Sequence, residues 1–218
     1  WLNQEFLPTL HNYEDYLLLD NVWDTTLNTS SIPSRPLYTT SLTRTVGLLN
    51  SYEYYTTYTN SDKLATSSTG YLNNKVYWWL LTPSDEGTSA SVSYVNSSGS
   101  LKTSDPTYGY GIRPSVYLKS TVQIAGGTGI QSDPYILEND MGELVNGITS
   151  LSTRYSGEYI IFNNELYRIV DVENGLTKII AVDKPSSLLS NLFNNWTGVT
   201  SFEEARIKTE LETYYQNM

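Results

Sequence analysis

The chain offers few side chains that could carry out acid–base or nucleophilic chemistry. It has no cysteine, which excludes thiol nucleophiles, thiolate metal sites and disulfide bonds together. His11 is the single histidine, and it falls in a segment with helix-like spacing of apolar residues. Neither a Ser-His-Asp set nor a cluster of histidine ligands can be assembled around it. We therefore expect His11 to be a surface or packed side chain, and the protein to be no enzyme and to use no cofactor.

Adjacent carboxylates, the other common device for acid–base work, occur in three pairs. These are Glu14-Asp15, Asp85-Glu86 and Glu203-Glu204. Neighbouring residues point to different sides of a helix or strand, so the two members of a pair cannot act on one substrate atom. Asp85-Glu86 lies in a loop, where it could contribute to a Ca²⁺ site together with carbonyls and hydroxyls. Solvated loop charges are the simpler interpretation.

Composition and charge favour an extracellular, β-rich protein. The formal net charge is −10, whereas nucleic acids and anionic membranes attract basic patches, so neither is expected as a partner. No apolar run approaches the roughly 20 residues of a membrane helix. The chain has 19 tyrosines and only 17% charged residues, which suits a module that displays hydroxyls and flat aromatic faces. Its length of 218 residues allows one large domain or two small ones.

The stretch of residues 77–119 is the densest in large apolar side chains. Trp78 and Trp79 begin an apolar run that ends at Pro83, and an alternating pattern then turns at Gly99 and returns, which predicts a hairpin. Two adjacent tryptophans are best placed at the centre of a core. Because neighbouring side chains of a strand face opposite ways, at most one of them could stack on a ligand.

The segments before this stretch are predicted to be short elements and loops. The apolar spacing of residues 2–19 predicts a helix that Pro8 interrupts, with Asn12 capping a second helix. Residues 20–37 are expected to be irregular. Residues 41–54 predict either a short strand that leads into a turn or a turn of helix.

Beyond the hairpin the sequence predicts further strands and then a linker. A strand is expected over residues 116–124, before the glycine-rich residues 125–129. A short extended segment is expected at residues 133–137. Residues 138–156 show no sustained hydrophobic period and are typical of a linker.

A three-stranded meander is predicted between residues 157 and 182. Asn163-Asn164 and Asn174-Gly175 separate its strands, and these residue types tolerate the positive φ that tight hairpin turns need. A helix with an apolar face is then predicted from Ser201, which forms a capping box with Glu204.

Residues 77–84 and 111–115 resemble the signature, roughly WWLRSP…GVRPA, of an uncharacterised bacterial surface domain family. The match is good at the two tryptophans, the proline and the Arg-Pro pair. Leu81 and Thr82 stand where the family has arginine and serine, so any role of that arginine does not carry over.

The family is in turn similar to the C-type-lectin-like and formylglycine-generating-enzyme-like folds, and it occurs in secreted or surface proteins of Gram-positive bacteria and their wall-less relatives. The resemblance implies an α+β fold, a β-rich C-type-lectin-like domain with short helices. Formylglycine-generating enzymes depend on cysteines, so their activity is not expected. At the family's position beside Pro114, Arg113 is expected to pair with a buried carboxylate or carbonyls and to pin the hairpin to the core.

The segments of that family occur here in a permuted order. Its members typically start with a meander, continue with a helix and only then reach the tryptophan motif. In this chain the meander, with Arg168 in the matching Tyr-Arg-Ile-Val run, follows that motif. The resemblance therefore implies that residues 1–137 are the second part of a lectin-like domain. Residues 138–156 are then a linker, and residues 157–218 the first part of the same domain type.

Neither part is expected to fold well alone. The shorter part buries too little surface, and the longer one would leave an unpaired sheet edge. The parts can join within one chain, as in a circular permutant, or between chains, so that each molecule completes the next head to tail. A third interpretation is an arbitrary cut from a longer tandem array.

We therefore expect a non-enzymatic extracellular structural protein, a subunit or repeat of a cell-surface fibre or array assembled head to tail from copies of itself. The alternative is a carbohydrate- or protein-binding adhesin module that meets glycans or host or cell-surface proteins. Two sets of residues carry these expectations. The structural anchors are Trp78, Trp79, Pro83, Arg113, Pro114 and Arg168, and the assembly segment contains Tyr159, Ile161, Phe162, Tyr167, Ile169, Leu211 and Tyr215.

Overall fold

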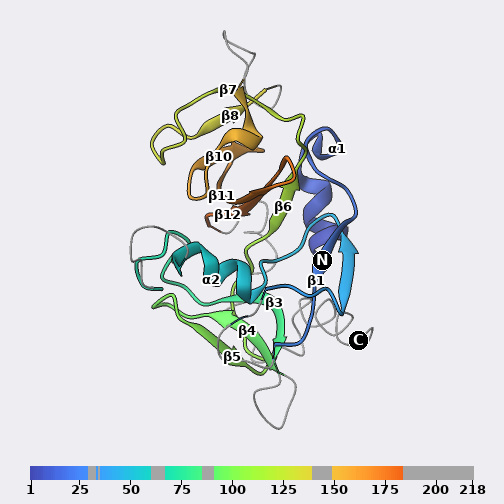
Figure 1. Cartoon of the computed structure of the whole chain (residues 1–218), viewed down its shortest axis with the longest axis vertical. Coiled ribbons are helices and arrows are strands. Elements are labelled where there is room, and N and C mark those ends of the chain that lie inside the picture. The colour runs from blue at the N-terminus through green and yellow to red at the C-terminus, as the bar shows by residue number, and fades with distance from the viewer. Residues whose placement is uncertain (29–32, 34, 60–66, 85–90, 139–148, 184–218) are drawn as a thin grey trace.

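Short strands dominate the architecture, as Figure 1 shows. This computed structural model describes residues 1–28, 33, 35–59, 67–84, 91–138 and 149–183. Its helical elements are η1 (Leu2–Phe6), η2 (Leu7–Thr9), α1 (Tyr13–Tyr16), α2 (Ser51–Thr59) and η3 (Leu151–Thr153). A β-rich α+β fold with short helices is therefore confirmed. None of the helices in the described ranges is long and apolar enough to cross a membrane.

The strands form three sheets. Their bounds are β1 (Asn21–Asp24), β2 (Ser41–Arg44), β3 (Trp78–Ser84), β4 (Ser91–Val95), β5 (Leu101–Ser104), β6 (Ser115–Leu118), β7 (Gln123–Gly126), β8 (Tyr135–Leu137), β9 (Thr149–Ser150), β10 (Tyr159–Phe162), β11 (Glu165–Glu173) and β12 (Leu176–Ala181). The largest sheet has the order β6-β12-β11-β10-β8-β7-β9, the second is β3-β4-β5, and β1 pairs with β2. In Figure 1 the largest sheet lies above α2 and the second sheet below it.

The predicted meander is confirmed as β10, β11 and β12. Its first turn has Asn163 and Asn164 at φ 53° and 61°, and its second has Asn174 and Gly175 at φ 52° and 79°. Both pairs adopt the left-handed backbone that two-residue hairpins require. The antiparallel pairing of β10 with β11 and of β11 with β12 follows from these turns.

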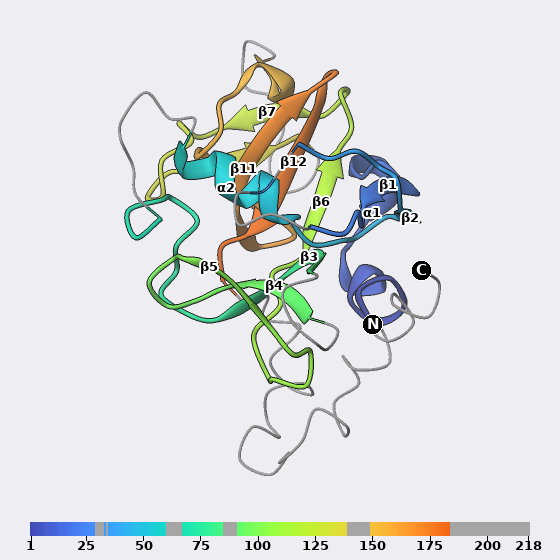
Figure 2. The same ribbon diagram turned by 60° about the horizontal axis from the view of Figure 1, so that its bottom comes forward.

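The meander and the first part of the chain share one sheet. β12 pairs antiparallel with β6, with Ile180 opposite Ser115, and β10 pairs in parallel with β8, with Ile160 opposite Tyr135. Figure 2 shows β6 and β12 side by side. Both pairings are made within one chain, and the largest hydrophobic cluster accordingly contains buried residues from both parts.

Both tryptophans of β3 are buried, on opposite faces of the strand. Trp78 packs in a cluster with Tyr54 and Ile180, whereas Trp79 packs in another cluster with Trp23. Their exposed fractions are 1% and 0%, so neither ring can serve as a binding platform. The alternation of a strand thus places one tryptophan in each of two clusters.

The N-terminal expectations are met in part. Residues 2–19 form η1, η2 and α1, and Pro8 lies in η2, so the predicted break is confirmed. The predicted cap is wrong, because Asn12 has a left-handed backbone at the start of α1 and makes no capping side-chain bond. Residues 20–37, expected to be irregular, contain β1, and residues 41–54 contain both β2 and the first turns of α2.

The hairpin prediction is confirmed, but the strand prediction after it is wrong. β4 and β5 pair around Gly99, whose φ is 79°. The single strand expected over residues 116–124 is split into β6 and β7 by a turn in which the Val122 N–H bonds the Lys119 carbonyl at 3.1 Å. Within the expected linker, β9 and η3 form at residues 149–153. The helix expected from Ser201 lies outside the described residues.

Gly47 lets the indole ring of Trp23 lie directly against the backbone. A Cβ atom at Gly47 would lie 2.4 Å from Cδ2 of that ring. Hydrogen bonds of 3.0 and 2.9 Å between the backbones of Gly47 and Ser115 hold the glycine in place. The chain therefore has no room for a larger residue at this position.

Replacing Gly47 by alanine is expected to lower the free energy of unfolding by about 1–3 kcal/mol, because neither the pinned backbone nor the packed indole can move away. Urea unfolding followed by circular dichroism measures this loss. Gly126→Ala is the matched control, since a Cβ there meets nothing within 4 Å. Equal losses in the two variants would contradict the steric explanation.

Candidate functional site

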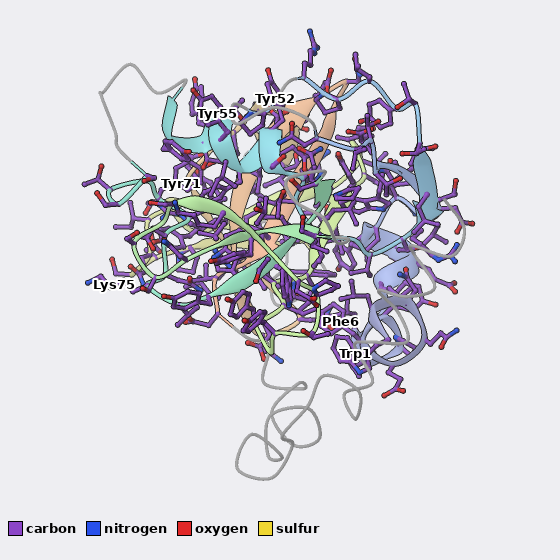
Figure 3. All side chains as sticks on the ribbon, turned by 90° about the horizontal axis from the view of Figure 1, so that it is seen from below. Trp1, Phe6, Tyr52, Tyr55, Tyr71 and Lys75 are labelled. Carbon is purple, nitrogen blue, oxygen red and sulfur yellow. The ribbon has the colours of Figure 1, made fainter. Side chains whose placement is uncertain are left out.

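A cleft of about 950 Å³ opens between α2 and strands β11 and β12 of the meander. Figure 3 labels two of its tyrosines, Tyr52 on α2 and Tyr71 in the segment that leads towards β3. The lining residues are Arg35, Pro36, Tyr38, Tyr52, Glu53, Thr56, Thr57, Tyr71, Tyr117, Tyr155, Ser156, Val170, Asp171, Glu173, Asn174 and Lys178. The cleft therefore has walls from both parts of the chain and is rich in tyrosine.

The first turn of α2 is fixed by a capping box. The Glu53 N–H donates to Asn50 Oδ1 at 2.8 Å, and the Asn50 N–H donates to Glu53 Oε2 at 2.9 Å. This reciprocal pair satisfies two backbone donors at the helix start. It also holds the Glu53 carboxylate at the cleft wall, with Oε1 left to bind a second partner.

That partner is Lys178, which β12 places opposite Tyr117. The Lys178 ammonium forms an ion pair with Glu53 Oε1 and lies 4.4 Å from the ring centre of Trp23 and 4.7 Å from that of Tyr117. We call Trp23, Glu53 and Tyr117 the ammonium cage. The side chain of Lys178 is only 3% exposed, so the carboxylate and the two ring faces offset the cost of burying its charge.

Three tyrosines of the cleft, Tyr38, Tyr71 and Tyr117, have a raised pKa. Burial raises the pKa of Tyr117, and the nearby carboxylates of Glu53 and Asp171 raise it further. Burial also raises the pKa of Tyr71 and of Tyr38. Their hydroxyls therefore remain protonated at neutral pH, where each can donate one hydrogen bond and accept others.

Arg168 holds the edge of the cleft at Tyr71. Its guanidinium donates to the Tyr71 carbonyl and to the Gly157 carbonyl, the latter at 2.9 Å. It also lies over the rings of Tyr71 and Tyr159, at 4.8 and 4.2 Å from their centres. Burial lowers the pKa of Arg168, and the ring and carbonyl contacts compensate the buried charge.

Arg113 links the same segment to β12 from inside the core. Its Nε donates to the Ala181 carbonyl at 2.9 Å and its Nη1 to the Leu72 carbonyl at 2.7 Å. The guanidinium lies 4.6 Å from the ring centre of Trp78. Burial lowers the pKa of Arg113 to about 10, so the side chain remains cationic at neutral pH.

Of the structural anchors and the assembly segment, the residues that the structure describes are buried or half-buried. Trp78, Trp79, Pro83, Arg113 and Pro114 are buried, and Arg168 is half-buried. In the assembly segment Phe162, Tyr167 and Ile169 are buried, Tyr159 and Ile161 are half-buried, and Leu211 and Tyr215 lie outside the described residues. Among the described residues of these two sets, no side chain lines the cleft.

The candidate chemical groups do not come together. His11 is exposed, and its backbone N–H and carbonyl bond the side chain of Asn163. Glu14 and Asp15 are exposed on α1. The other carboxylate pairs, at residues 85–86 and 203–204, lie outside the described residues. In the part of the chain that the structure describes, no cluster of three or more His, Asp or Glu side chains could hold a metal ion.

Sequence reasoning missed the cleft. Its tyrosines entered only as part of the composition. The spacing of Asn50 and Glu53 is a capping-box signal that could have located the start of α2. No local pattern marks Lys178, because its partner Glu53 is 125 positions away.

Replacing Arg113 by lysine is expected to lower the free energy of unfolding by about 2–5 kcal/mol. Lysine lacks the Nε donor and the planar fork with which Arg113 reaches two separate carbonyls, so one buried acceptor loses its partner. Thermal and urea unfolding measure the loss. Arg44→Lys is the control, since the side chain of Arg44 is exposed and bonds only its neighbour, the Thr43 carbonyl. An Arg113→Lys variant as stable as this control would show that the guanidinium bonds contribute little.

The chain matches a known sequence family over part of its length. The model of a family described as "Domain of unknown function (DUF6273)" matches residues 1–120. The three residues of the ammonium cage fall inside this match, whereas Lys178 falls outside it. No curated protein and no solved structure matches the chain.

Proposed function

The chain belongs to the DUF6273 family, and we propose that it is a non-enzymatic binding module of a bacterial cell surface whose tyrosine-lined cleft takes carbohydrate. The single observation that carries this proposal is the cleft between α2 and the meander. The C-type-lectin-like architecture implied by the sequence resemblance belongs to the same proposal, and a fold analogy of this kind contributes little by itself.

The side chains of the cleft suit a ligand with alternating C–H faces and hydroxyl groups. A sugar ring packs its C–H face on an aromatic ring, and Tyr52 and Tyr38 present rings that are partly or largely exposed. The tyrosine hydroxyls of the lining, together with the hydroxyl of Thr56, can donate to and accept from sugar hydroxyls. Aromatic surface with a few placed polar groups is the usual make-up of a small-molecule site.

The opposite wall supplies exposed polar groups, two of which are carboxylates. Asp171, Glu173 and Asn174 lie exposed on and after β11. Two of these side chains are carboxylates that can accept from a pair of sugar hydroxyls, while Arg35 provides donors across the cleft. The site is thus suited to a neutral glycan better than to a polyanion.

The arrangement favours binding over catalysis. Glu53, the carboxylate nearest the floor of the cleft, is already bonded to Lys178 and to the Asn50 N–H. A group held in this way is a poor general acid or base, because its proton would have to displace an ion pair. The lining includes no histidine and no cysteine in the described residues.

Tyr52→Ala is expected to weaken glycan binding by about tenfold or more, because a stacked ring contributes on the order of 1.4 kcal/mol or more. A glycan array identifies the ligand, and titration calorimetry with that glycan measures the affinity. Tyr108→Ala is the control, since Tyr108 is a 56% exposed tyrosine outside the cleft. A silent array, or an equal loss in the two variants, would argue against the cleft as a sugar site.

A second candidate function is structural, as a subunit or repeat of a fibre or array assembled head to tail. The observation that favours it is the docking of the meander on the rest of the chain. Ile160, Phe162 and Ile179 of the meander pack in one cluster with Leu17 and Leu118. A meander from a neighbouring molecule would make the same contacts, so a closed monomer and an exchanged assembly are built from one interface.

Electron microscopy of the native protein tests this structural function directly. Filaments or arrays with an axial repeat of one domain are the expected result. The structural function would be ruled out if the protein remained monomeric in sedimentation at high concentration and formed no ordered assembly on the cell surface.

A further inference from the structure

We propose that the ammonium cage of Trp23, Glu53 and Tyr117 is an acceptor site for a lysine carried on a β-strand, and that during assembly the strand it takes is β12 of a second copy of this chain. This inference rests on the second proposed function, assembly by exchange of the meander. It identifies the contact that specifies which strand is accepted.

The cage is held in shape by its own neighbours and not by its occupant. The Trp23 Nε1–H donates to the Arg44 carbonyl at 2.8 Å, and the backbone of Gly47 backs the indole ring. Glu53 is oriented by the capping box with Asn50. The contacts of Trp23 and Glu53 lie within the family-matched residues 1–120, so they do not depend on the presence of β12.

The cage selects a cation and sets the strand register. Its two ring faces, 5.4 Å apart between centroids, and its carboxylate attract an ammonium, whereas a neutral occupant would leave Glu53 without its ion pair. A shift of β12 by one residue would turn Lys178 to the other face of the sheet. A shift of two would bring Leu176 or Ile180 to the cage instead.

Nothing in the geometry of these contacts requires the two partners to belong to one chain. The bonds that hold the meander on the first part include the β6–β12 and β8–β10 ladders, the Arg113 bond to the Ala181 carbonyl, the Arg168 bond to the Tyr71 carbonyl and the Lys178 ion pair. Exchange between two copies preserves all of them. The second copy would then also supply Asp171 and Glu173 to the cleft, which is incomplete without the meander.

Concentration decides between the closed chain and the exchanged assembly. A tethered meander has an effective concentration on the order of millimolar, so a dilute chain closes on its own β12. When many copies are crowded on a surface, their local concentration approaches that effective concentration. A mismatched contact within each chain favours the exchanged assembly further. Substitution of Glu53 in the cage, or of its occupant Lys178, creates such a mismatch.

The test uses two full-length variants with different affinity tags, Glu53→Lys and Lys178→Glu. Each variant brings two like charges together within its own chain. In a one-to-one mixture, exchange restores the native pair in one cleft and forms the reversed pair in the other. We expect a mixed complex whose Kd is at least about tenfold lower than that for self-association of either variant. Co-purification through both tags and sedimentation measure it.

Because Lys178 is buried, a variant that is unfolded by itself remains informative. Recovery of the β-sheet circular dichroism on co-refolding the two variants is then the same positive result. Variants that stay separate, or stay unfolded together, overturn the proposal. Lys102→Glu, at an exposed position on β5, replaces Lys178→Glu in the control and must give no mixed complex with Glu53→Lys.

The outcome is independent of the carbohydrate proposal. Glycan binding is measured on the wild-type chain, in which the closed monomer already has a complete cleft. Failure of the mixed complex therefore leaves the glycan result untouched. Conversely, a chain that binds no glycan can still exchange its meander.

Discussion

The antiparallel pairing of β12 with β6 is the constraint on which the rest of the structure depends. It brings Lys178 opposite Tyr117 and the Ala181 carbonyl within reach of Arg113. It also sets β11 beside α2 across the cleft, because β11 follows β12 in the sheet. The core, the cleft and the ammonium cage are thus consequences of one strand ladder between residues that are far apart in the sequence.

Three cationic side chains join the two parts of the chain, and the charge of each is stabilised by the same kinds of contact. Arg113, Arg168 and Lys178 all lie against aromatic rings and bond a carbonyl or a carboxylate. Buried charges are expensive unless they are paired, so such contacts reject partners that present the wrong group more strongly than they add stability. In the proposed assembly, electrostatics would chiefly select the partner strand, while apolar packing would provide most of the adhesion.

Local features could be predicted from the sequence, and long-range ones could not. The turns at Asn163 and Asn174 follow from the backbone preferences of these residues, so the meander could be predicted from the sequence. Pro83 was expected to end an apolar run, yet β3 continues through it, because the ladder is interrupted by a register shift between Trp79 and Pro83. The cleft depends on a contact between Glu53 and Lys178 that no periodicity encodes. Its residues are ordinary ones until the fold brings them together.

The position of β12 also has a consequence in time. It is the most C-terminal of the described strands, yet it lies between β6 and β11 in the sheet. About 60 residues separate Leu118, the last residue of β6, from Ala181, and ribosomes add about 5–20 residues per second, so β6 waits roughly 3–12 s for its partner during synthesis. Throughout that interval its edge is open to any compatible strand. If meanders exchange between molecules as proposed, the pace of translation, as well as the strength of the contacts, would affect whether β6 first meets its own β12 or that of a neighbour.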